Sequence, residues 1–144
     1  MAASAGFVVS VANWPDEEAA IRLVREHVFV HEQNVPADLE WDGRDAACVQ
    51  VLARSRAGDP VGTARMMEDG RIGRMAVLAG WRGRGIGRAM LELLIDFARR
   101  RGLRRVHLAS QAHAIGFYAA SGFVAEGAEF MEAGIPHRHM TLDL

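Results

Sequence analysis

The sequence predicts an α/β (α+β) protein with a mixed sheet, in which an antiparallel meander is followed by a strand–helix–strand crossover. Two patterns carry this prediction. Three apolar runs between residues 46 and 77 are separated by short turn segments, which is typical of antiparallel strands. After a glycine-rich segment, apolar residues recur every three or four positions from Ile86 to Phe97, which indicates a long amphipathic helix.

The N-terminal part predicts one strand and one helix. The apolar, β-branched run Phe7 to Ala12 predicts the strand, and residues 13–16, Asn-Trp-Pro-Asp, are typical of a helix start. Ile21, Val24 and Val28 follow at helical spacing, and the helix is expected to end before Pro36. Residues 34–45 are polar and predict a loop with a helical turn near residue 37.

The meander comprises three predicted strands. Ala46 to Ser55 and Pro60 to Met67 are joined by the turn at residues 56–59. A second turn at residues 68–70 leads into Arg71 to Val77. The chain from residue 46 to residue 77 is therefore expected to form an antiparallel sheet.

The C-terminal part predicts two helices and three strands. Gly102 closes the long helix, and the short strand Val106 to Ala109 is expected to lie parallel to residues 71–77 through a right-handed crossover. A shorter helix, Ala112 to Ser121, is stopped by Gly122. The last two strands are expected to form an antiparallel pair, Phe123 to Phe130 and His137 to Leu142.

Composition indicates a globular protein. The 144 residues are 50% hydrophobic, which excludes a disordered chain, and residues 1–144 are expected to form a single domain. No apolar run reaches membrane-spanning length and no signal peptide is evident, so a cytoplasmic location without membrane association is expected. The lone Cys48 cannot form an internal disulfide and is expected to be an unreactive core thiol.

A glycine loop, defined as residues 82–88 (Arg-Gly-Arg-Gly-Ile-Gly-Arg), lies between the third meander strand and the long helix. Gly83, Gly85 and Gly87 leave backbone N–H groups free to converge on an anion at the helix N-terminus, where the helix dipole also favours negative charge. The loop therefore predicts a phosphate-binding site. A plain glycine-rich turn with exposed arginines is the alternative.

Two other phosphate motifs fit poorly. A dinucleotide-binding fingerprint requires a glycine where Arg88 stands, and a Walker loop requires a lysine, whereas all 17 Lys+Arg residues are arginine. A nucleic-acid-binding patch is disfavoured because the overall pI is near 6.6 and no aromatic residues interleave the arginines from Arg99 to Arg105.

Two segments resemble the signatures of one enzyme family. Residues 77–87 (Val-Leu-Ala-Gly-Trp-Arg-Gly-Arg-Gly-Ile-Gly) resemble the acyl-CoA pyrophosphate loop of the GNAT N-acetyltransferases, and residues 111–123 resemble the second signature of that family. Residues 28–36 and 134–137 are similar to the ElaA/YjcF-like branch. Two departures are Ala79, where many members have proline, and Gln111, where many have asparagine.

The resemblance implies a GNAT fold and transfer of an acetyl group from acetyl-CoA directly to an amine of a small molecule or peptide, in a ternary complex without a metal. A backbone N–H of the strand before the loop would polarise the thioester. The implied coenzyme contacts are Met75, Ala76, Val77, Arg82, Gly83, Arg84, Gly85, Ile86, Gly87, Arg88, Gln111, Ala114 and Phe117.

The resemblance also places the catalytic acid at Tyr118, the only tyrosine, because a neutral phenol can protonate a departing thiolate. Glu32 is the first candidate for the base and His137 the second, with a water chain as the alternative to both. A solvated loop carboxylate is the structural alternative for Glu32. His27 and His31 do not follow the His-Glu-x-x-His pattern, so no metal site is predicted.

The acidic segment Asp38 to Asp45 is expected to attract a cationic amine acceptor. A non-catalytic acyl-CoA-binding sensor is the alternative function. The oligomeric state stays open, with a homodimer as one option.

Overall fold

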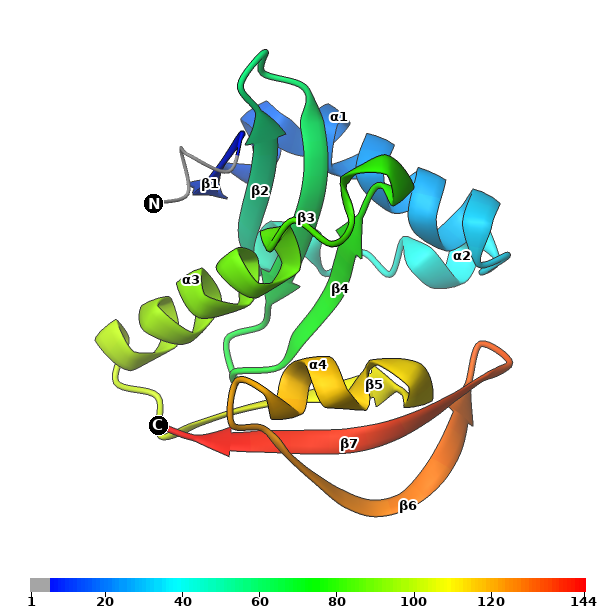
Figure 1. Ribbon diagram of the computed structural model, residues 1–144, viewed down its shortest axis with the longest axis vertical. Helices are drawn as coiled ribbons and strands as arrows, with labels where there is room; N and C mark the ends of the chain where they lie inside the picture. The colour runs from blue at the N-terminus through cyan, green and yellow to red at the C-terminus, as the bar shows by residue number, and fades with distance from the viewer. Residues whose placement is uncertain (1–5) are drawn as a thin grey trace.

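The computed structural model describes residues 6–144 and contains two antiparallel sheets, with helices packed on the first (Figure 1). The order of strands and helices confirms the predicted mixed α/β (α+β) class. The elements are β1 (Phe7–Ala12), α1 (Trp14–Arg25), the π-helix η2 (Glu26–Glu32), α2 (Ala37–Glu40), the 3₁₀ turn η3 (Asp45–Ala47), β2 (Val49–Ser55), β3 (Pro60–Met66), β4 (Ile72–Val77), the 3₁₀ turn η4 (Ala79–Trp81), α3 (Ile86–Arg100), β5 (Arg105–Gln111), the 3₁₀ turn η5 (Ala112–Ala114), α4 (Ile115–Ala119), β6 (Val124–Glu132) and β7 (Ile135–Asp143).

The first sheet has the order β1-β2-β3-β4 and buries both of its faces. Because successive strand side chains point to opposite faces, β2 contributes Val51 and Ala53 to the core with α3, and Leu52 to a smaller core with α1. Of the apolar residues whose spacing predicted α3, Ile86, Met90 and Leu94 are fully buried, whereas Leu93 and Phe97 are only partly buried.

The second sheet has the order β5-β7-β6 and pairs with the first through an isolated parallel bridge between Arg71 and His107. At this bridge the His107 amide donates to the Gly70 carbonyl at 3.1 Å. In Figure 1, β6 and β7 lie below the first sheet and run across the direction of β4. The predicted parallel pairing is thus limited to the start of β4.

A bulge in β4 explains why the two sheets diverge. The β3–β4 register shifts between Thr63 and Arg65, and Arg74 has φ +51°, a left-handed conformation that is uncommon for a residue with a side chain. A bulge bends its strand and increases the local twist. The edge of Met75–Val77 that faces β5 is therefore left without a partner strand among the described residues.

The first helix ends as a π-helix, which the apolar spacing did not predict. In η2 the Gln33 amide donates to the Val28 carbonyl at 3.0 Å, five residues back. Val28 is buried, and it lines a cavity together with Phe29, Glu32 and Gln33. The π-helix, a geometry that recurs at functional sites, thus places side chains of η2 and of its C-cap Gln33 on the cavity wall.

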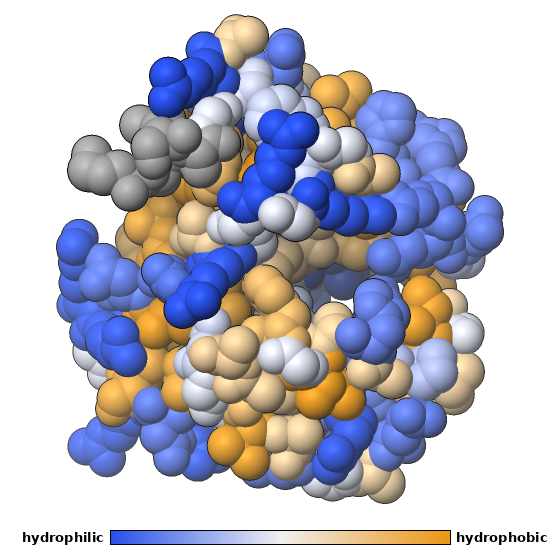
Figure 2. All heavy atoms as spheres, viewed as in Figure 1, coloured by the Kyte–Doolittle hydropathy of each residue, from blue (hydrophilic) through white to orange (hydrophobic). Residues whose placement is uncertain are grey.

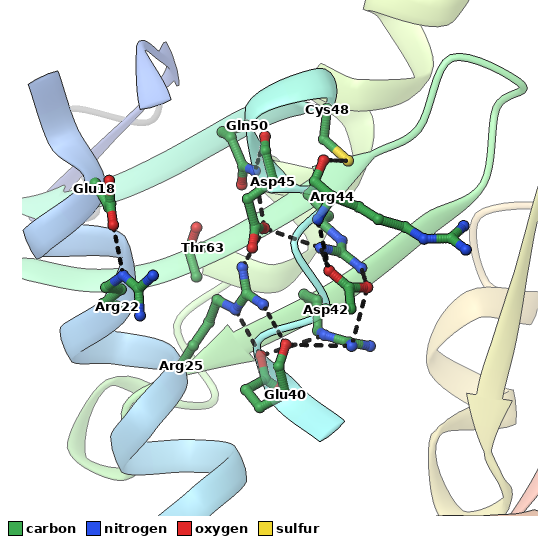
Figure 3. Close-up of polar contacts among 12 residues, drawn as sticks. Glu18, Arg22, Arg25, Glu40, Asp42, Arg44, Asp45, Cys48, Gln50 and Thr63 are labelled. Carbon is green, nitrogen blue, oxygen red and sulfur yellow. Dashed lines mark hydrogen bonds and ion pairs between the residues drawn. The ribbon is translucent and has the colours of Figure 1, made fainter. Parts of the chain in front are cut away.

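A buried ion cluster fixes the loop after η2 and is shown in part in Figure 3. The fully buried Arg25 donates through Nε to Glu40 Oε2 at 2.6 Å and through Nη1 to Asp45. Asp45 begins η3, so the predicted strand at residues 46–55 starts only at Val49. The members of the cluster are Arg25, Glu40, Asp42, Asp45, Arg65 and Arg74.

Ionisation within the cluster follows from its pairing. Hydrogen bonds from Arg65 hold the pKa of Asp42 well below its usual range. Burial alone would raise the pKa of Asp45, but hydrogen bonds from Arg25 and Arg65 outweigh it and lower that pKa. Burial raises the pKa of Glu40 despite its arginine neighbours. The aspartates of the cluster are therefore charged at neutral pH.

Cys48 lies outside the core, contrary to the prediction. Its half-buried thiol donates to the Arg44 carbonyl at 3.3 Å, and burial raises the pKa of the thiol. A thiol of this kind is a poor nucleophile. Separately, no helix within residues 6–144 combines the length and apolarity needed to cross a membrane.

Candidate functional site

A cavity of about 1060 Å³ lies between the diverging strands β4 and β5. It is lined by side chains of η2, β4, the glycine loop, β5, α4 and the β6–β7 hairpin. On the face in Figure 2, the surface is hollowed between the first sheet and the segment that carries α4. The cavity therefore brings together segments from both halves of the chain.

The glycine loop leads into the N-terminus of α3 at one end of this cavity. Gly83 and Gly85 have φ +77° and +90°, and a Cβ built on either would meet no atom within 4 Å. No side chain caps the helix, so its first N–H groups stay free for an anion. The backbone and the open space beside it fit a phosphate group.

Gly87 has a packing role in addition to its predicted contact with the coenzyme. It lies in the first turn of α3, and a Cβ there would be 3.2 Å from the Phe117 ring. The missing side chain lets α3 and α4 approach closely and brings Phe117 to the cavity wall.

The arginines of the loop each have a partner. Arg82 donates through Nη1 and Nη2 to the two carboxylate oxygens of Glu32, both at 2.7 Å, and through Nε to the Val77 carbonyl at 2.9 Å. Arg84 stacks on the Trp81 ring at 4.5 Å, and Arg88 donates to Glu92 at 2.9 Å.

Tyr118 projects from α4 toward β4. Its hydroxyl donates to the Met75 sulfur at 3.8 Å, and its ring packs edge-on against Phe117 and Phe123, with centroid distances of 4.9 and 6.0 Å. Burial raises the pKa of Tyr118 to about 12. The phenol is neutral at physiological pH, and because a thioether is a weak acceptor, its O–H can donate to a stronger one.

The two candidate bases lie on different walls of the cavity. The hydrogen bonds of Arg82 lower the pKa of Glu32, which keeps that carboxylate charged and weakly basic. His137 is almost buried, with Nδ1 2.6 Å from the Ile135 carbonyl and Nε2 3.7 Å from Glu132 Oε2. Since a carbonyl only accepts, Nδ1 carries the proton of the neutral ring and Nε2 is the free acceptor.

A polar chain connects η2 with β5 at the cavity edge. The Gln111 amide donates to Gln33 Oε1 at 2.9 Å, and His113 Nε2 lies 2.6 Å from Gln111 Oε1. Gln111 was predicted at this site from its motif, whereas Gln33 and His113 carried no signal of their own. The predicted contacts Ala114 and Ile86 also line the cavity.

The acidic segment is not the free negative surface that the sequence predicted. Of its four carboxylates, Glu40, Asp42 and Asp45 are paired with arginines of the buried ion cluster. Only Asp38 in this segment has no such pairing. Attraction of a cationic acceptor by these residues is therefore not supported.

Within residues 6–144, no three His, Cys, Asp or Glu side chains gather closely enough to hold a metal ion. The pair His27 and His31 has ring centroids 5.9 Å apart, and His31 Nε2 lies 3.4 Å from Glu26.

Comparison with known proteins agrees with this geometry. Residues 12–144 match the family model described as an acetyltransferase (GNAT) domain. The chain belongs to the GNAT acetyltransferase family. It is accordingly an N-acyltransferase that uses an acyl-CoA donor, and the predicted family is confirmed.

Individual relatives and solved structures support the same assignment. The uncharacterized N-acetyltransferase YjcF of Bacillus subtilis is 37% identical over 83% of this chain and 88% of its own. The crystal structure of an acyl-CoA N-acyltransferase from Pseudomonas aeruginosa is 30% identical, with a TM-score of 0.82 over 94% of this chain and 98% of its own. Escherichia coli ElaA is 26% identical, with the same TM-score and coverage.

Proposed function

We propose that this GNAT enzyme transfers the acetyl group of acetyl-CoA directly to a primary amine of a small molecule or peptide, within a ternary complex in the cytoplasm. The observation that carries the proposal is that a phosphate-fitting helix N-terminus and a buried neutral phenol line the same cavity. Acyl transfer from a coenzyme A thioester requires a binding site for the diphosphate and a proton donor for the departing thiolate in the same cavity.

Coenzyme binding would use three parts of the cavity. The diphosphate would accept hydrogen bonds from the backbone of the glycine loop and the first turn of α3. The pantetheine arm would pair with the free edge of Met75–Val77, whose other edge pairs with β3. Gln111, Ala114 and Phe117 would line the opposite wall.

The chemistry then needs two proton transfers. The amine nitrogen attacks the thioester carbonyl carbon, so that a C–N bond forms and the C–S bond breaks. A backbone N–H of β4 would stabilise the oxyanion, and Tyr118 would donate its proton to the departing thiolate. The attacking ammonium must first lose a proton to a base.

The geometry favours His137 over Glu32 as that base. Nε2 of His137 has a free lone pair, and the nearby Glu132 carboxylate would stabilise the imidazolium that forms. Glu32 is already held by two hydrogen bonds from Arg82, so it would act by positioning that arginine for the coenzyme.

Paired substitutions separate the two candidates. His137→Gln is expected to lower kcat about 100-fold, within the range for general base catalysis, with little change in KM for acetyl-CoA. Glu32→Gln is expected to act mainly on KM for acetyl-CoA, because it changes the position of Arg82. Steady-state kinetics with a fixed amine measure both, and a loss of kcat confined to Glu32→Gln would reverse the assignment.

The glycine loop can be tested by a single methyl group. Gly85→Ala places a side chain at φ +90°, which is expected to cost about 1–2 kcal/mol of folding free energy. Because the strain shifts the loop N–H groups, affinity for coenzyme A is expected to fall about tenfold, equivalent to about 1.4 kcal/mol. Calorimetric titration with coenzyme A measures this loss.

Gly80→Ala is the matched control, because Gly80 lies just before the loop and a Cβ there meets no atom within 4 Å at an ordinary φ. Equal affinities for coenzyme A in the two variants would argue against a diphosphate at residues 83–88.

A further inference from the structure

The end of the cavity away from the glycine loop is lined by charged side chains. Arg65 lies on β3, Arg71 directly precedes β4, and Arg74 lies on β4. Glu40 and Glu132 come from α2 and the end of β6. His137 lies among them on β7. If acyl-CoA enters at the glycine loop, as the proposed function requires, the acceptor amine meets these residues.

Most of these charges are already paired. Arg65 is bound to Asp42 and Asp45, and its side chain is only 3% exposed. Arg74 Nε lies 3.3 Å from the buried Glu40 carboxylate, and Arg74 Nη2 donates to the Leu39 carbonyl at 3.1 Å. Removing these groups from their partners to bind a substrate would leave buried charges uncompensated.

The pair Arg71 and Glu132 is different. Their closest nitrogen and oxygen atoms are 4.0 Å apart, beyond hydrogen-bond length, and the side chains are 43% and 50% exposed. A pair of this kind contributes little to stability. A ligand with complementary charges can therefore separate the two side chains at small cost.

The surroundings of Glu132 connect this pair to the proposed chemistry. Glu132 Oε2 lies 3.7 Å from His137 Nε2, and Glu132 Oε1 is the oxygen nearest to Arg71. An ammonium group bound to Glu132 would thus lie beside the imidazole that is to remove its proton. The ammonium group of the acceptor and the imidazole of His137 would then be close enough for proton transfer.

Resting on the proposed function, we infer that the acceptor is a zwitterionic amine of the amino-acid class, whose carboxylate binds Arg71 and whose ammonium group binds Glu132. The planar guanidinium of arginine matches a carboxylate with two parallel hydrogen bonds. A purely cationic amine would bind Glu132 but would leave the nearby Arg71 without an anionic partner. The acceptor is therefore expected to carry a negative group next to its amine.

Matched pairs of acceptors test this inference. L-leucine, L-phenylalanine and L-glutamine are each compared with their carboxamides, which keep the side chain and lose the negative charge. Converting the carboxylate to a carboxamide lowers the pKa of the ammonium group toward about 7.7–8.0, the usual range for a peptide N-terminus. At a given pH the amide therefore presents more free amine than the acid does. This bias acts against the inference, and a preference for the acid is therefore informative.

For the wild-type enzyme, kcat/KM for the acid is expected to be at least about tenfold above that for the amide. The reason is that hydrogen bonds between Arg71 and a charged carboxylate are stronger than those to a neutral amide. In Arg71→Gln the acid-to-amide ratio is expected to fall to about one, mainly through KM for the acid. Glu132→Gln is expected to raise KM for acid and amide alike. Arg105→Gln removes an ion pair with Asp143 outside the cavity and is expected to keep the wild-type ratio.

Three outcomes have distinct meanings. Transfer to amides that equals or exceeds transfer to the acids would overturn the inference and leave the acyltransferase proposal standing. A wild-type ratio that persists in Arg71→Gln would also overturn the inference, because the carboxylate would then be bound elsewhere. Transfer to neither class of amine would overturn the inference, and it would overturn the proposed function as well only where no other primary amine accepts the acetyl group.

Discussion

Replacing Tyr118 with phenylalanine is expected to lower kcat for acetyl transfer by about 10²–10⁴-fold, the range for loss of a general acid. The ring and its contacts with Phe117 and Phe123 stay in place, so KM for acetyl-CoA is expected to change little. The hydroxyl contacts only a weak acceptor, the Met75 sulfur, and its removal is expected to cost less than about 1 kcal/mol of stability. Stopped assays of thiol release measure kcat and KM, and thermal unfolding measures the change in stability.

The pH dependence gives a second check. Since burial raises the pKa of Tyr118 to about 12, the phenol stays protonated well above neutrality, and wild-type kcat is expected to show no loss from its ionisation up to about pH 10. Full activity of Tyr118→Phe would exclude the phenol as the acid. Binding of acetyl-CoA by wild type without transfer to any amine would favour the alternative of a non-catalytic sensor.

Replacing Arg25 with methionine is expected to lower the free energy of unfolding by about 3–5 kcal/mol, the usual result of removing one partner from a buried ion pair. The substitution leaves the carboxylates of Glu40 and Asp45 without their main donor. Arg25 is fully buried and the methionine side chain fills a similar volume, so lost packing contributes little. Chemical denaturation gives the change.

Arg22→Met provides the matched control. Arg22 lies one turn earlier on α1 and pairs with Glu18 in a half-exposed ion pair. Both arginines stack on the Trp41 ring, Arg22 at 4.4 Å and Arg25 at 4.7 Å, so this contact is matched in the two variants. Its loss is expected to cost less than about 1 kcal/mol. Similar losses for both variants would show that the buried ion cluster contributes no more than surface charge.

Acid unfolding follows from the same cluster. The pKa values of Asp42 and Asp45 are lowered by their arginines, so their contribution to stability is complete above the unfolded-state value of about 3.9 and declines as the pH falls further.

The sequence predicted most elements because their signals are local. Strand alternation and helical spacing depend on neighbours a few residues apart, and Gly102 and Gly122 end helices with φ +82° and +97°. The glycine loop was predicted for the same reason, since a strand, a turn and a helix start are adjacent along the chain. Tyr118 was assigned from the resemblance of residues 111–123 to one family signature.

The features that the sequence did not predict depend on contacts between distant residues. Arg82 and Glu32 are fifty positions apart, and either residue alone has the signature of a solvated side chain. The buried ion cluster neutralises the acidic segment through arginines from α1 and β3, which composition alone cannot pair. The bulge at Arg74 limits the parallel pairing of β4, although nothing in the residues marks it.

The most direct test of the account is a crystal structure of the protein with coenzyme A. The diphosphate is expected on the backbone N–H groups of residues 83–88, with the thiol at hydrogen-bond distance from the Tyr118 hydroxyl, in the cavity between β4 and β5. A diphosphate bound away from the start of α3, or a thiol remote from Tyr118, would contradict it.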